Sequence, residues 1–273
     1  MTRTARVKSP TDYYHIVMRG NNRERVFGSS ENKELFIKCA KMQVDNGLIE
    51  IAAYCVMDNH VHLIIKAGIE DLATAMKRIN IRYAMIYNEK NDRVGHVFQD
   101  RFKSESIADD TYLLQVIRYV HNNPVKAKIV KHPKEYKWSS YCQYFEGVTV
   151  VAQEQRDFVM KHFDNRIKAF GEFHEQVDKS EYLEINEDIE KERYEIAQEI
   201  ISEYFGSNGL TDGKQVMKNY ERLEELVTRL LAESRLSHRK IAYLLGVSSN
   251  VVHSISYEKI KKQKEQPWQD LTQ

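Results

Sequence analysis

The chain has 273 residues, 42% of them hydrophobic, which is enough for one large or two medium domains with apolar cores. Its 41 basic and 40 acidic residues nearly cancel, so the placement of charge is more informative than the net value of +1. Three separated cysteines argue against a disulfide framework or a cysteine-based zinc site, and no secretory signal or bilayer-length apolar run is present. These features predict a cytoplasmic protein that does not enter a membrane.

The first part of the chain alternates between strand-like and helical patterns. Runs of aromatic and β-branched residues indicate strands, whereas apolar residues at helical spacing indicate helices. Strand, helix, two strands, helix and strand are expected, in that order, over residues 13–19, 31–46, 48–57, 60–66, 70–88 and 101–108. This order predicts an α+β fold in which an antiparallel sheet carries helices on one face.

A further helix is expected to begin at the capping residues Asp109 and Asp110 and to run to about Asn122. Asn123 precedes Pro124, and a residue before proline disfavours the α conformation. We therefore expect the helix to unwind at Asn123.

Residues 124–145 are rich in lysine and aromatic residues. Such a mixture suits a surface that binds a nucleic-acid backbone and stacks on bases. A solvated basic face beside a small aromatic core fits the composition equally well, so both interpretations stay open.

The carboxy-terminal part divides into a connecting segment and a helical region. Carboxylates dominate residues 172–195, which is typical of a linker or a solvated helix start, and a helix is expected over 189–205. We predict a first domain over residues 1–150, a connecting segment over 151–188 and a helical DNA-binding domain over 189–273.

Residues 237–256 have helix-turn-helix form. The small Ala242 lets two helices approach, Gly246 makes the turn, and Val252 and Ile255 pack the second helix inward. This arrangement favours duplex-DNA binding over plain three-helix packing. The side chains expected to face a major groove include Ser249, Asn250 and His253.

Two histidines one residue apart, His60 and His62, open a predicted strand after the polar pair Asp58-Asn59. Side chains alternate along a strand, so both imidazoles project from the same face. They could provide two metal ligands or could simply cap the strand at a hairpin. The motif alone does not decide between these roles.

A second motif lies on the helix that precedes Pro124. Tyr119 and Asn123 are four residues apart, which places them on one helical face. A tyrosine hydroxyl, whose pKa is about 10, is a poor nucleophile near neutral pH unless a cation or a base assists it. A metal beside a bound phosphate would provide such help.

Together these motifs resemble those of the single-tyrosine transposases of the HUH superfamily. The segments Tyr14–Asn22, Met57–His62 and Arg118–Ala127 resemble the REP-associated tyrosine transposases in particular, and the similarity covers about residues 10–145. The resemblance implies a ferredoxin-like HUH nuclease fold, here followed by an all-α helix-turn-helix domain.

The resemblance also implies a chemistry. Tyr119 would attack a scissile phosphate of single-stranded, hairpin-containing DNA, leaving a 5′-phosphotyrosine and a 3′-hydroxyl. His60 and His62 would bind Mg²⁺ or Mn²⁺, with Asn123 as a third ligand. In the same domain, the residues expected to contact DNA are Arg19, Asn21, Asn22, Arg78, Arg82, Arg101 and Lys126.

Two other functions remain open. The chain could be a domesticated DNA-binding regulator with little or no cleavage activity, although a domain kept only for binding has no chemical need for His60, His62 and Tyr119 together. A replication or conjugative nickase is weaker, because the expected order of the motifs is reversed. We expect a DNA-bound, nucleoid-associated monomer or homodimer.

Overall fold

The computed structural model describes residues 7–145, 150–176, 180, 182–183, 186–210, 216 and 219–265. The chain divides into two compact units, Met1–Leu183 and Glu184–Gln273. None of the described helices combines the length and apolarity that crossing a bilayer requires.

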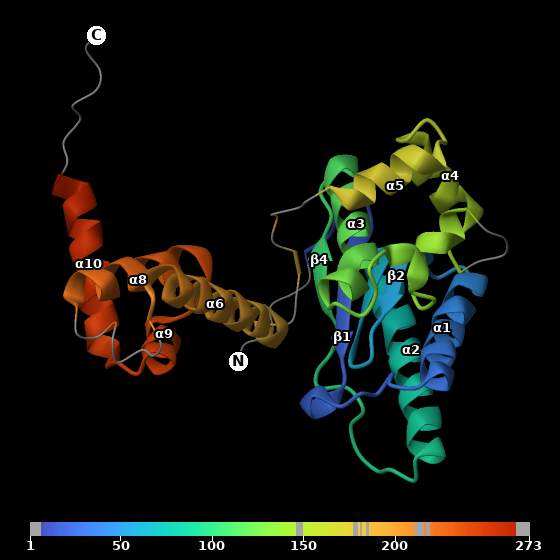
Figure 1. Ribbon diagram of the computed structural model, residues 1–273. Coiled ribbons are helices and arrows are strands. Elements are labelled where there is room, and N and C mark those ends of the chain that lie inside the picture. The colour runs from blue at the N-terminus through green and yellow to red at the C-terminus, as the bar shows by residue number, and fades with distance from the viewer. Residues whose placement is uncertain are drawn as a thin grey trace. The chain divides into compact units, whose positions relative to one another are not determined.

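The first unit is built on a four-stranded antiparallel sheet (Figure 1). Its strands are β1 (Tyr13–Arg19), β2 (Glu50–Val56), β3 (His60–Lys66) and β4 (Lys103–Ser106). Their spatial order is β2-β3-β1-β4, with β1 paired to both β3 and β4. This is the ferredoxin-like order, which confirms the predicted α+β class.

One face of the sheet is covered by α1 (Ser30–Asp45) and α2 (Ile69–Lys90). The Ser29 side chain caps α1 by accepting a hydrogen bond from the backbone N–H of Asn32. Alternate strand residues such as Ile16 and Leu63 pack against these two helices in a common core.

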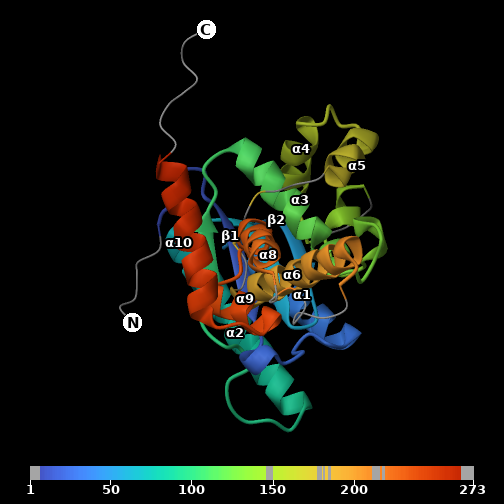
Figure 2. The ribbon, with the colours of Figure 1, turned by 60° about the vertical axis from the view of Figure 1, so that its left-hand side comes forward.

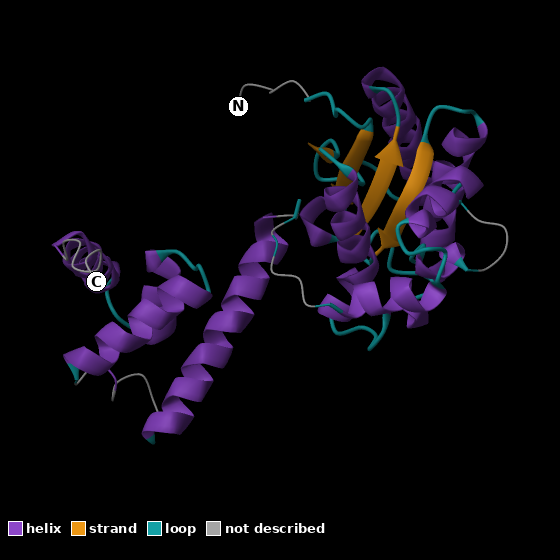
Figure 3. Ribbon diagram, turned by 90° about the horizontal axis from the view of Figure 1, so that it is seen from above, coloured by secondary structure: helices purple, strands orange, loops and turns teal. Residues whose placement is uncertain are grey.

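The opposite face is covered as well, by α3 (Asp110–Lys126), α4 (Gln153–Lys161) and α5 (Ile167–Glu175) (Figure 1, Figure 3). The expectation of helices on one face was wrong. All seven residues of β1 are buried, because apolar side chains of α3 cover the side that α1 and α2 do not.

Helices α4 and α5 lie side by side and belong to the first unit (Figure 1, Figure 2). Their residues Val159 and Phe170 are fully buried in the core that includes α3. We expected residues 151–188 to be a connecting segment, but residues 153–175 of it contribute core helices. Residues 177–179, 181 and 184–185 of this segment lie outside the described residues.

Helix α3 does not unwind at Asn123 as expected but continues through Pro124 to Lys126. Pro124 has no N–H, so the helix lacks one backbone hydrogen bond in its last turns. The carbonyl of Asn123 accepts from the N–H of Ala127, and that of Pro124 accepts from Ile129, so the chain beyond the proline is still held.

The basic and aromatic stretch after α3 contributes its rings to the core. Tyr136, Tyr141 and Tyr144 are buried, and the hydroxyls of Tyr136 and Tyr144 donate to carbonyls of β2. Of the two interpretations left open for residues 124–145, the structure supports a basic surface over an aromatic core.

The second unit is all-helical among its described residues. It comprises α6 (Asn186–Asn208), α8 (Tyr220–Glu233), α9 (His238–Leu245) and α10 (Ser249–Glu265). Gly246 ends α9 with a φ of 69°, a left-handed conformation that suits glycine at a helix terminus. Val252 and Ile255 are buried, as the helix-turn-helix pattern predicts.

Candidate active site

His60 and His62 lie at the start of β3, on the sheet face that α3 covers. Their rings are 5.0 Å apart, centroid to centroid. His62 is only 2% exposed, whereas His60 is partly exposed. Burial, with help from neighbouring His60, His15 and Lys126, lowers the pKa of His62 well below its usual value. His62 is therefore neutral and keeps a lone pair on its ring.

The neighbouring strand β1 brings a third histidine to this face. His15 is fully buried, and its Nε2 lies 3.0 Å from Nδ1 of His62. On the other side, its Nδ1 lies 3.9 Å from a carboxylate oxygen of Glu105 on β4. His15 therefore has polar contacts on both sides of its ring rather than apolar packing alone.

Tyr119 meets both buried histidines. Its ring makes edge contacts with His62 at 5.5 Å and with His15 at 5.8 Å between centroids. The half of the site on β3 and the half on α3 are therefore in contact. Asn123 follows one turn later on the same side of α3 and is 8% exposed. Lys126 places its Nζ 5.7 Å from the Tyr119 ring centroid.

A hollow of about 150 Å³, open to solvent, lies beside the Tyr119 ring. The ring is also stacked, at 4.6 Å and 26°, on Tyr182, a residue after α5. The residues that line the hollow are Arg118, Tyr119, Asn122, Lys126, Gln176, Ser180 and Tyr182. Cationic and aromatic groups beside a tyrosine hydroxyl suit an anionic substrate with planar rings.

The side chains beside Tyr119 can be compared with the ligands that a divalent cation requires. The Nδ1 of His60 lies 2.7 Å from the Asn59 carboxamide oxygen, so it carries the proton and leaves Nε2 as a ligand. The Nδ2 of Asn123 is buried without a hydrogen-bond partner among the described residues, and rotating the amide would present its oxygen instead.

No three His, Cys, Asp or Glu side chains form a metal-binding group in the described part of the chain. A cation held by His60 and His62 would therefore need an amide, water or phosphate oxygen as its next ligand. These residues fit a mixed imidazole and oxygen site.

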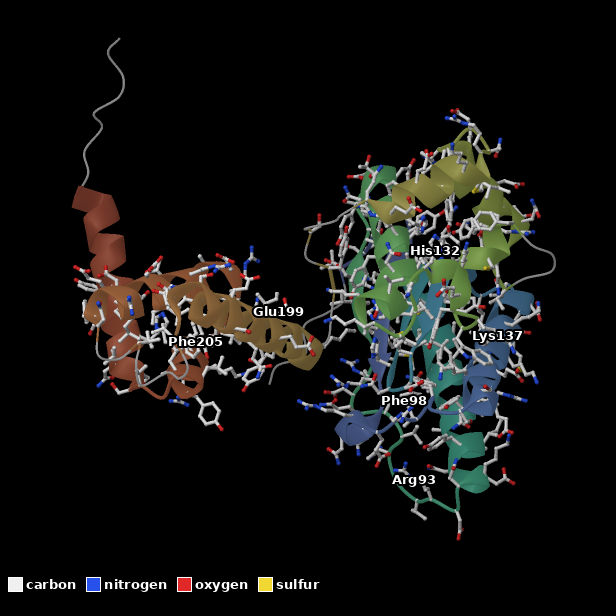
Figure 4. The ribbon with its side chains drawn as sticks, viewed as in Figure 1. Arg93, Phe98, His132, Lys137, Glu199 and Phe205 are labelled. Atoms are coloured by element: carbon white, nitrogen blue, oxygen red, sulfur yellow. The ribbon has the colours of Figure 1, made fainter. Side chains whose placement is uncertain are left out.

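The residues predicted to contact DNA fall in four places, one of which is the hollow beside Tyr119, where Lys126 lies. Arg19 pairs with His60 across β1 and β3, and Asn21 and Asn22 form the 3₁₀ turn that follows, in which Asn22 has a φ of 48°. Next to this turn, Gly20 forms a bridge with Phe98, in the segment that leads to the exposed Arg101 (Figure 4).

The remaining residues predicted to contact DNA lie on α2 and α10. Arg78 and Arg82 are exposed on α2, which covers the sheet face opposite the two histidines. The structure does not bring them to the hollow beside Tyr119. Ser249, Asn250 and His253 are exposed at the start of α10 in the second unit.

Comparison with known proteins identifies the first unit. Residues 9–123 match the family model "Transposase IS200 like". This segment is an IS200-like transposase domain. The domain belongs to the HUH tyrosine transposases, a family of enzymes that act on DNA, and it contains the two histidines and Tyr119. The helical second unit lies beyond the matched segment.

Solved structures that are similar to the chain include two transposases. The structure of a REP-associated tyrosine transposase bound to a REP hairpin is 16% identical, with 56% of this chain and 94% of that chain covered and a TM-score of 0.45. That of a candidate transposase from Deinococcus radiodurans R1 is 17% identical, with 44% and 97% covered and a TM-score of 0.30. No curated protein matches the chain.

Sequence reasoning missed several neighbours of the transposase motifs. The sequence predicts for Asn59 only a place in the polar pair before a strand, for Glu105 a place in a strand, and for Tyr182 a place in the connecting segment. The signal for Glu105 is its register opposite His15, which becomes visible only when the pairing of β1 with β4 is known.

Proposed function

We propose that the transposase domain is a metal-dependent single-stranded DNA endonuclease and strand transferase that uses Tyr119 as its nucleophile. The observation that carries this proposal is the contact of the Tyr119 ring with the rings of His62 and His15. This contact supports the proposal because the proposed nucleophile and the proposed metal ligand His62 come from distant parts of the chain and are neighbours.

The reaction is a transesterification. The Tyr119 hydroxyl oxygen attacks the scissile phosphorus and loses its proton to solvent, and the bond between phosphorus and the 3′ oxygen breaks. The departing oxygen takes up a proton, which leaves a free 3′-hydroxyl and a 5′-phosphotyrosine. Attack by the 3′-hydroxyl of a second strand reverses these bond changes and frees Tyr119, so that joining needs no ATP.

The residues divide the remaining work. His60, His62 and Asn123 would hold Mg²⁺ or Mn²⁺, which supplies Lewis-acid polarisation of the phosphate when bound. Lys126 places a positive charge next to the Tyr119 ring, where it attracts the DNA backbone. Hairpin-containing single-stranded DNA is the proposed substrate, since the REP-associated relative is bound to such a hairpin.

The test is formation of a covalent adduct. We expect the full chain, incubated with hairpin-containing single-stranded DNA and Mn²⁺ or Mg²⁺, to yield a DNA–protein species that survives denaturing electrophoresis. Tyr119→Phe removes the only attacking oxygen and should abolish the adduct. Tyr220→Phe, at an exposed tyrosine of the second unit, should leave it unchanged. An adduct formed by Tyr119→Phe would disprove the assignment of the nucleophile.

We further propose that the second unit reads duplex DNA through α10. Ser249, Asn250 and His253 are exposed at its start, where a recognition helix contacts base edges. Asn250→Ala should weaken binding to the cognate duplex, once selected, by about 5- to 150-fold, equivalent to about 1–3 kcal/mol for a lost base contact. Fluorescence anisotropy measures this, with Ser207→Ala on α6 as the control; an unchanged affinity would exclude Asn250 from the interface.

The main alternative is a regulator that binds DNA without cutting it. Its prediction is tight DNA binding with no adduct under any divalent metal, a result that would favour this function over the transferase.

A further inference from the structure

A row of three polar side chains crosses the sheet beside Tyr119, and the proposed chemistry uses only one of them. His62 on β3, His15 on β1 and Glu105 on β4 lie on the same face, and the last two are direct partners in the register of β1 and β4. Placing a histidine that is fully buried in the middle of a sheet is costly unless its ring nitrogens have partners.

The contact between the two histidines can hold only one proton. Their facing nitrogens, Nε2 of His15 and Nδ1 of His62, are 3.0 Å apart, so one ring donates and the other accepts. If His15 donates, His62 carries its own proton on Nε2 and has no lone pair for a cation. If His62 donates, its Nε2 is left as a ligand.

Glu105 decides between the two arrangements. Its carboxylate oxygen lies 3.9 Å from Nδ1 of His15, a distance at which the interaction is electrostatic rather than a hydrogen bond of normal length. Interaction with His15 lowers the pKa of this carboxyl, against the opposing effect of burial, and the Tyr112 hydroxyl also bonds to it. A negative charge there repels a lone pair on Nδ1 of neutral His15 and attracts an N–H.

We infer that His15 and Glu105 form a positioning pair that orients the His62 ring and holds it in the tautomer whose Nε2 can bind a cation. In this arrangement His62 donates its Nδ1–H to Nε2 of His15, and His15 directs its own Nδ1–H towards Glu105. His60 is held in the same tautomer, with its proton on Nδ1, by the carboxamide oxygen of Asn59. This inference rests on the proposed metal site, in which outer partners of a ligating histidine fix its tautomer and raise its affinity.

The tautomer can be measured without any metal. We expect long-range ¹H–¹⁵N spectra of the metal-free, ¹⁵N-histidine-labelled full chain to show His62 protonated at Nδ1 and His15 also protonated at Nδ1. His62 protonated at Nε2 in the wild-type protein would overturn the inference, whether or not the protein cuts DNA.

Variants then test whether the pair acts through His62. His15→Phe keeps the ring volume but removes the acceptor, and should weaken Mn²⁺ binding by about 10–100-fold, measured by electron paramagnetic resonance of free Mn²⁺ without DNA. His15→Gln restores an acceptor and should recover most of the affinity. Glu105→Gln removes the charge and should shift His62 towards its Nε2–H tautomer. His96→Phe, an exposed histidine of the same unit, is the matched control.

The outcomes separate this inference from the proposed function. Unchanged tautomer and Mn²⁺ affinity in folded His15→Phe would overturn the positioning pair while leaving the transferase intact. A wild-type chain that binds no Mn²⁺ would instead contradict the proposed metal site, and the tautomer measurement would still report on His15 and Glu105. Should His15→Phe fail to fold, Glu105→Gln provides the comparison, and an unchanged His62 tautomer in that variant would overturn the positioning pair.

Discussion

Two other buried histidines, His121 on α3 and His174 on α5, form a hydrogen-bonded pair away from Tyr119. Nδ1 of His174 donates to the carbonyl of Phe170 at 2.8 Å, so its Nε2 accepts from Nδ1 of His121 at 2.9 Å. Nε2 of His121 then accepts from the Ser140 hydroxyl at 2.8 Å. While both rings are neutral, each ring nitrogen has a partner of the matching kind.

This pair predicts acid sensitivity. Burial lowers the pKa of His174 to about 4, below the value of about 6.5 expected in the unfolded chain. Because the unfolded chain takes up the proton first, the free energy of unfolding should fall as the pH drops from about 6.5 towards 4, by up to about 3 kcal/mol.

Urea denaturation followed by Trp138 fluorescence, in a chain carrying Trp268→Phe, measures this dependence. His174→Gln removes one titrating group and should flatten the profile over the same pH range. An equally steep loss of stability in that variant would show that other groups cause it.

The turn between α9 and α10 offers a test at the level of the helices. Gly246 has a φ of 69°, so Gly246→Ala should destabilise the second unit by about 1 kcal/mol. Gly206 lies inside α6 with open space around its Cα, and Gly206→Ala should stabilise that unit by up to about 1 kcal/mol. Helical circular dichroism during chemical denaturation compares the two, and a Gly246→Ala chain that is as stable as the wild type would contradict the assigned turn.

Most helices and strands could be predicted from local patterns, because each depends on a short run of residues. Which helices cover each face of the sheet could not be predicted as well. β1 lacks polar alternation, which is the signature of a strand buried on both faces, but α4 and α5 come from a segment whose charge resembled a linker. Whether the helix ends at Asn123 also depended on the surrounding structure, since α3 continues through Pro124.

At the scale of the molecule, the site was predictable only where local geometry sufficed. The shared face of His60 and His62 follows from alternation along one strand, and Tyr119 and Asn123 follow from helical spacing. The neighbours His15, Glu105 and Tyr182 depend on strand register and chain path, which a single sequence does not determine.

The same geometry predicts that one chain holds a complete active site. Tyr119 contacts His62 of its own chain, so no partner is needed to supply the nucleophile. A mixture of His60→Ala and Tyr119→Phe proteins should therefore form no more covalent DNA adduct than either variant alone, because every chain lacks either a metal ligand or the attacking hydroxyl. Mixing each variant with the wild type controls for inhibition. If the mixed variants recovered adduct formation, the Tyr119 helix would have to act on the histidines of a second chain.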